Sequence, residues 1–134
     1  MAVRSPRLPI LVLVGWTLFL WVSRLRNVFA DDDLSTSGVV WRVVVVVVFV
    51  AFAGAVIAAL RTGRPPLGQT VQALALWTIL FWLVRGTAIL IDDHEASFKA
   101  VHSALMAVSI GAAAWAWSTV RALSPDDHPA VASR

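Results

Sequence analysis

The chain has 134 residues, of which 59% are hydrophobic and 14% are charged, and its mean hydropathy is +0.79. This composition excludes an ordinary soluble domain and indicates a membrane protein. The absence of cysteine excludes disulfides, thiolate metal sites and cysteine nucleophiles. The net charge of +3 does not indicate nucleic-acid binding, because the arginines lie near the ends of apolar segments, where arginine anchors membrane spans.

Four apolar segments follow one another along the chain, at residues 8–30, 39–60, 70–91 and 98–123. Each is long enough to cross a hydrocarbon core of about 30 Å at about 1.5 Å per residue. The first segment is similar to a signal peptide, but Arg24 and Arg26 interrupt that pattern, so we expect it to remain in the mature protein. The connections are short. The sequence therefore predicts an all-α bundle of four transmembrane helices.

Residues 16–33 and 77–94 share a pattern, 61 positions apart, in which six of the eighteen positions are identical. The shared residues are Trp16-Thr17, Trp21, Arg24 and Asp31-Asp32, matched by Trp77-Thr78, Trp82, Arg85 and Asp92-Asp93. Such an internal repeat predicts a duplicated helical hairpin, with copies at residues 1–66 and 67–134. Because each copy contains two spans, both insert in the same orientation, around a pseudo-twofold axis along the membrane normal.

The distribution of basic residues predicts the orientation. With four spans both termini lie on one side, and that side carries six arginines against four or five basic residues on the other. The positive-inside rule then predicts that the termini lie in the cytoplasm. We expect the protein in the plasma (inner) membrane. Two stripes of small residues also predict that the second and fourth spans approach each other closely. The stripes are Ala51, Ala55 and Ala59, and Ser103, Ala107 and Gly111.

Two arginines lie inside predicted spans, where an ionisable residue is costly and is by default a functional hypothesis. Arg24 and Arg85 each lie three residues after a tryptophan and seven residues before an Asp-Asp pair. At this spacing Arg and Asp share one helix face. Two interpretations stay open. Each arginine extends toward the headgroups beside a Trp anchor, or the pair forms a network with the aspartates of both copies or holds an anionic lipid headgroup. The predicted network comprises Arg24, Arg85, Asp31, Asp32, Asp92, Asp93, Trp21, Trp82 and His102.

The acidic clusters at residues 31–33 and 92–95 have two interpretations. They are solvated helix ends, or they face each other and hold a divalent cation through oxygen ligands, with His94 suited to zinc. His102 is the one histidine within a predicted span, and its counterpart in the first copy is Trp41. A bis-histidine haem is therefore not expected, and we expect His102 to bond to Asp93 or Glu95. No cofactor or metal is predicted.

No nucleophile motif, glycine-rich phosphate loop or zinc-helix motif occurs, so we expect no catalytic activity. The leading hypothesis is an accessory or scaffold subunit of a cell-envelope or transport complex. Its partner would be a larger membrane protein or a second copy of the chain, in addition to the bilayer. The alternatives are a small cation transporter or channel with an acidic outer vestibule, and a module that binds anionic lipids.

One part of the second copy resembles a known family. Trp77, Trp82 and Asp92-Asp93 are followed by Phe98, Val101-His102, Ser109 and Gly111. This order resembles a family of small two-helix actinobacterial membrane proteins to which no activity is assigned. The resemblance implies an actinobacterial source and a membrane hairpin. The first copy departs from it, with Ser37 at the position of Phe98 and Trp41 at that of His102.

Overall fold

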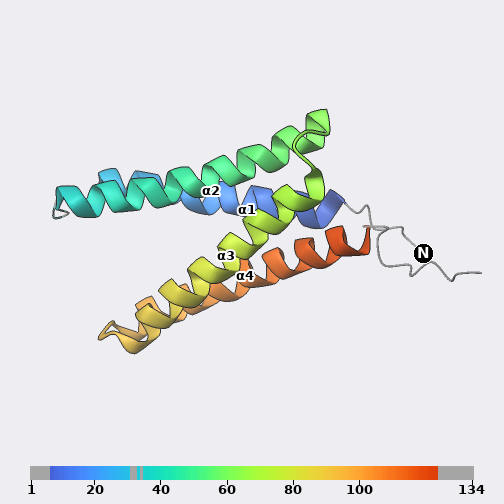
Figure 1. Cartoon of the computed structure of the whole chain (residues 1–134). Helices are drawn as coiled ribbons and strands as arrows, with labels where there is room; N and C mark the ends of the chain where they lie inside the picture. The colour runs from blue at the N-terminus through green and yellow to red at the C-terminus, as the bar shows by residue number, and fades with distance from the viewer. Residues whose placement is uncertain (1–6, 31–32, 34, 124–134) are drawn as a thin grey trace, which may run out of the picture.

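The computed structural model describes residues 7–30, 33 and 35–123, and these form four helices and their connections. The helices are α1 (Arg7–Phe29), α2 (Thr36–Thr62), α3 (Leu67–Ile91) and α4 (Ala96–Ala122) (Figure 1). The described residues confirm the predicted all-α class, and all four helices are long and apolar enough to span a membrane, as a multi-pass protein requires. The last three begin two or three residues before the predicted apolar segments, because capping and polar residues complete their first turns.

Local interactions fix the helix ends. The Ser35 hydroxyl accepts a hydrogen bond from the Gly38 amide at 3.2 Å and caps the start of α2. At its other end, Gly63 has a left-handed φ of 71° and donates its N–H to the Ala59 carbonyl. The Lys99 ammonium group donates to the Leu90 carbonyl at 3.0 Å, so that α4 satisfies a backbone acceptor at the end of α3.

The helices pack as two hairpins, α1 with α2 and α3 with α4, and the hairpins contact each other through α1 with α4 and α2 with α3 (Figure 1). The predicted approach of α2 and α4 through their small-residue stripes is therefore wrong. Ala51, Ala107 and Gly111 from those stripes are exposed. The helix α4 instead buries a different face, which includes Ala113 and Ala116, against its neighbours.

The hairpins pack closely near the ends that carry the chain termini and separate toward the other end (Figure 1). The close part is built from small side chains that are fully buried, such as Ala53, Ala75, Ala113 and Ala116. Small residues let helix backbones approach each other, which is the main source of helix association in lipid. In this half the Trp16 indole N–H also donates to the Ser109 hydroxyl at 2.9 Å and joins α1 to α4.

An aromatic cluster of Trp21, Phe49, Trp77 and Phe81 lies halfway along the bundle and ends the closely packed part. The Trp21 and Phe49 rings stack with centroids 4.1 Å apart, and Phe81 meets both rings edge-on at 5.1 and 5.3 Å. Trp77 lies against the other side of Phe49, at 6.0 Å. These rings come from α1, α2 and α3, so their contacts join the two hairpins. Because the rings are bulky, they also keep the helix backbones apart at this level.

Replacing Phe49 by Ala should destabilise the protein by about 3 kcal/mol, the low end for a buried phenylalanine, because lipid supplies no hydrophobic driving force between helices. Phe49 is fully buried, whereas Phe19 of α1 is 65% exposed and serves as the matched control. Unfolding in mixed micelles, followed by circular dichroism, measures both variants. Equal losses for Phe49→Ala and Phe19→Ala would contradict the role of the aromatic cluster.

Candidate functional site

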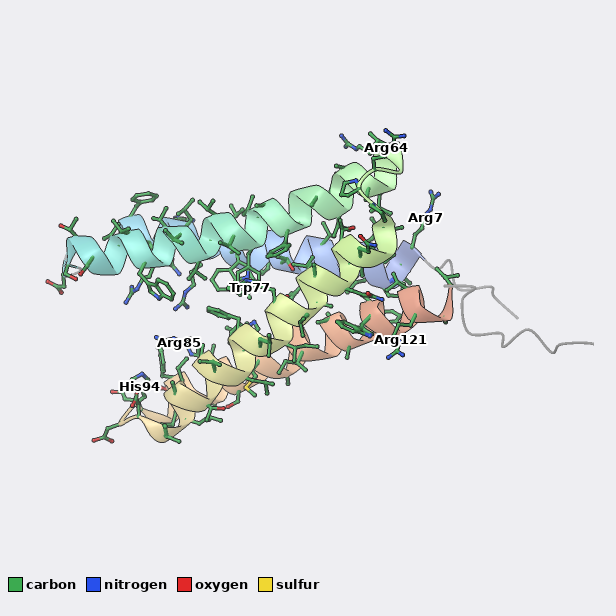
Figure 2. The ribbon with its side chains drawn as sticks, in the orientation of Figure 1. Arg7, Arg64, Trp77, Arg85, His94 and Arg121 are labelled. Atoms are coloured by element: carbon green, nitrogen blue, oxygen red, sulfur yellow. The ribbon has the colours of Figure 1, made fainter. Side chains whose placement is uncertain are left out.

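A cavity of about 680 Å³ lies between the hairpins in the half where they separate. All four helices line it, and α3 contributes the largest share of the lining residues. Figure 2 shows Trp77 between the two hairpins and Arg85 nearer the end that carries His94, while Arg7, Arg64 and Arg121 lie at the opposite end. The cavity therefore belongs to the end of the bundle away from the chain termini.

Three arginines line this cavity at a common level. Arg24 lies five residues before the end of α1, Arg85 six residues before the end of α3, and Arg42 six residues after the start of α2. In antiparallel hairpins these positions coincide, roughly 7–9 Å inside the helix ends at about 1.5 Å per residue. The positive charges of Arg42 and Arg85 both disfavour the charge of Arg24.

No acidic residue lines the cavity within the described part of the chain. Asp92 and Asp93 are exposed at the end of α3 and do not face it, and Asp31 and Asp32 lie outside the described residues. Among the residues that the structure describes, no carboxylate forms an ion pair with Arg24 or Arg85. The predicted Arg–Asp network thus stays a prediction, whereas Arg24 and Arg85 do share one site.

Four tryptophans line the same cavity: Trp21, Trp41, Trp77 and Trp82. Trp21 stacks on Phe49, so this part of the lining belongs to the aromatic cluster. The indole N–H groups of Trp77 and Trp82 are buried and have no hydrogen-bond partner. Trp82 keeps only 5% of its surface exposed. Both predicted tryptophans, Trp21 and Trp82, therefore line the same cavity as the arginines.

His102 also lines the cavity and is 8% exposed. The expected bond to Asp93 or Glu95 is wrong. The Nδ1 atom instead donates to the Phe98 carbonyl at 2.9 Å, because a helix places the side chain of residue i over the carbonyl of residue i−4. The imidazole packs against the Phe98 ring at 3.9 Å, and its Nε2 atom is buried without a partner.

The described residues contain no cluster of three histidine, aspartate or glutamate side chains that could hold a metal ion. His94 is exposed and packs edge-on against the Phe98 ring at 4.9 Å. The predicted divalent-cation site between the two acidic clusters depends in part on Asp31 and Asp32, which lie outside the described part of the chain. The chemistry that the structure brings together at the cavity is that of cations and N–H donors.

Three lining residues of the cavity, all on α2 and α3, are strongly exposed: Trp41 (68%), Leu80 (50%) and Val84 (74%). We infer from their exposure that the cavity opens sideways between these two helices. The ribbons of α2 and α3 separate on this side in Figure 1. In a bilayer these apolar side chains face hydrocarbon, so the cavity is continuous with the lipid chains while its arginines lie near one surface. An amphiphile fits this arrangement better than a small ion.

Sequence reasoning missed Arg42, Trp41 and Trp77 as members of the site. A signal for Arg42 was present, because an arginine six residues into an antiparallel span lies at the same depth as Arg24. The two aromatic residues carried no such signal. Trp41 lies near a predicted span end, where tryptophan is typical of an interface anchor, and Trp77 lies in the middle of an apolar span. Only the packing of the hairpins shows that both residues line the cavity.

Comparison of the chain with protein-family models, curated proteins and solved structures finds no match. The resemblance to small actinobacterial hairpin proteins therefore stays a prediction. The function has to be argued from the cavity itself.

Replacing Arg24 by Gln should stabilise the ligand-free protein by on the order of 1 kcal/mol, because it removes a half-buried charge that Arg42 and Arg85 repel. Arg26, two residues away and exposed, is the matched control, and Arg26→Gln should change the stability little. Unfolding of delipidated protein in neutral detergent measures both. A loss of stability in Arg24→Gln would show that this guanidinium has a favourable partner within the protein.

Proposed function

We propose that this protein binds an anionic lipid, with the headgroup at the three arginines and the chains leaving through the opening between α2 and α3. The observation that carries the proposal is the meeting of Arg24, Arg42 and Arg85 at one level of an aromatic cavity. The proposal takes up the lipid-binding alternative from the sequence. It concerns binding and assigns no catalytic step.

The first support is the free-energy cost of placing charged arginine side chains within a membrane span. An arginine near the centre of a span costs about 2.5–3.5 kcal/mol on insertion scales, and less toward the surface. Mutual repulsion adds to this cost for Arg24. An anionic headgroup offsets both contributions, and the planar guanidinium group suits it because it binds phosphate through two parallel hydrogen bonds.

The second support is the shape of the cavity. Its volume of about 680 Å³ lies within the range of ligand sites, roughly 300–1,000 Å³. Trp77 lies 14 residues before the end of α3, so the cavity extends about 21 Å into the bundle at about 1.5 Å per residue. The arginines lie in its outer part, and apolar residues such as Leu20 and Leu105 line the remainder. This division matches a headgroup followed by hydrocarbon chains.

The other functional hypotheses stay predictions. The exposed apolar side chains that a scaffold would offer to a larger membrane partner are also those that any membrane helix presents to lipid, so they do not favour a partner. A cation pathway needs negative charge, whereas the described lining carries arginines. If the termini lie in the cytoplasm, as the arginine count predicts, the bound headgroup belongs to the outer leaflet of the plasma membrane.

We also propose that the two hairpins are copies of one unit, related by a pseudo-twofold axis along the membrane normal. Burial supports this. The buried α1 residues Ile10, Leu13, Val14, Thr17, Trp21 and Val28 are matched, 61 positions later, by Val71, Leu74, Ala75, Thr78, Trp82 and Ile89, which are also buried. The bounds of α4 are those of α2 shifted by 60 residues, so the counterpart of His102 is Arg42 rather than Trp41. Both residues line the cavity.

Native mass spectrometry of protein extracted in mild detergent tests the lipid proposal. The parent protein should retain anionic lipid, and the double variant Arg24→Gln/Arg85→Gln should retain at least tenfold less, since two charge-assisted contacts are lost. The double variant Arg26→Gln/Arg61→Gln removes two exposed arginines outside the cavity lining and should behave as the parent. Failure of delipidated parent protein to rebind anionic lipid in a saturable way would refute the proposal.

A further inference from the structure

Three buried nitrogen atoms have no hydrogen-bond partner within the described part of the chain: Trp77 Nε1, Trp82 Nε1 and His102 Nε2. All three residues line the cavity that contains the arginines. Trp82 and His102 are more than nine-tenths buried. Buried polar atoms in native proteins nearly always have partners, so three unpaired atoms on residues that line one cavity favour a ligand with polar groups there.

The unpaired atoms need different hydrogen-bond partners. An indole N–H can only donate, so Trp77 and Trp82 need acceptor oxygens. His102 is different. Because a carbonyl oxygen can only accept, its Nδ1 carries the hydrogen that bonds to Phe98, and Nε2 of the neutral ring is an acceptor. The Nε2 atom becomes a donor only when the ring takes a second proton. The ligand must therefore offer oxygens to the indoles and share a proton with His102.

The positive charges of the cavity also restrict the class of headgroup that fits it. Three arginines, Arg24, Arg42 and Arg85, bring positive charge to the cavity and favour a headgroup with more than one negative charge. A phosphodiester headgroup brings one negative charge and no proton on its phosphate. A phosphomonoester brings about 1.5 to 2 negative charges near neutral pH, three free oxygens and one exchangeable proton.

We infer that the bound lipid carries a terminal phosphate, that is, a phosphomonoester headgroup; this inference rests on the proposed lipid-binding function. Phosphate oxygens accept from Arg24, Arg85 and the Trp82 indole. One oxygen faces His102 Nε2, and a single proton lies between them, on the oxygen or on the nitrogen, so that the pair is satisfied in both states. Trp77 lies five residues deeper along α3, about 7.5 Å, at a level suited to an oxygen of the linkage between phosphate and chains.

The test measures the affinity of the delipidated full-length protein for two lipids with identical chains. Phosphatidic acid has a terminal phosphate, and phosphatidylmethanol is a diester with no hydroxyl group. We expect phosphatidic acid to bind at least tenfold more tightly. In His102→Phe, which keeps a ring against Phe98, this preference should fall severalfold, and the part of it that the charges of Arg24 and Arg85 supply should remain. His94→Phe, an exposed histidine outside the cavity lining, is the matched control and should keep the preference.

A second variant covers the case in which His102→Phe does not fold. Trp82→Phe removes one indole donor and should weaken both lipids by about the same factor, severalfold, because either phosphate offers it an oxygen. Unchanged affinity of Trp82→Phe for both lipids would overturn the assigned donor role. A preference for phosphatidic acid that is unchanged in a folded His102→Phe protein would overturn the role of the imidazole.

The remaining outcomes separate this inference from the function on which it rests. Equal, saturable binding of the two lipids, lost in Arg24→Gln/Arg85→Gln, would overturn the terminal phosphate and leave lipid binding intact. Binding of neither lipid would overturn the proposed function itself. Glycerol 3-phosphate, which has the headgroup without chains, should not compete at millimolar concentration. If it competes as strongly as phosphatidic acid, the ligand is a soluble phosphomonoester and the lipid assignment is wrong.

Discussion

The contact of Trp21, Phe49 and Phe81 is the interaction on which the rest of the structure depends. Toward the start of α1 and the end of α4, alanines let the two hairpins approach closely. Toward the other end of the bundle the hairpins separate (Figure 1). The stacked pair at 4.1 Å and the two edge-on contacts hold three helices together with bulky, rigid groups. A bundle with alanine along its whole length would leave no space between the helices. The cavity thus follows from a change of side-chain size along the helix axes.

Electrostatic repulsion between arginines favours separation of the hairpins, as the bulk of the aromatic side chains does. Arg24, Arg42 and Arg85 lie on three different helices at one level, and their repulsion favours separation of the hairpins at that level. Stability alone would select against three such residues around one cavity within a bilayer. Their presence there, together with buried indole and imidazole nitrogens that have no partner in the described chain, is a local conflict of the kind found at functional sites.

The sequence predicted the helices well because hydropathy depends on composition and length, and these determine which segments span a membrane. It also predicted Arg24 and Arg85, because a charge within an apolar run is conspicuous. The sequence did not predict the rotation of each helix about its axis. Helices that are apolar all round show no inward face, so the small-residue stripes indicated the wrong faces of α2 and α4. The cavity, and with it Arg42 and Trp77, depends on those rotations.

Other occupants of the cavity satisfy only part of its chemistry. Water can pair with the indoles and with His102, but it does not neutralise the guanidinium groups. A small anion neutralises them, but it leaves the apolar inner part beside Leu20 and Leu105 without contacts and does not use the sideways opening at Trp41, Leu80 and Val84. A purely apolar chain fills the inner part and increases the cost of the nearby charges by excluding water. A molecule with an anionic, oxygen-rich end and a hydrocarbon end satisfies both halves of the cavity together, and this is the chemistry of the proposed anionic lipid.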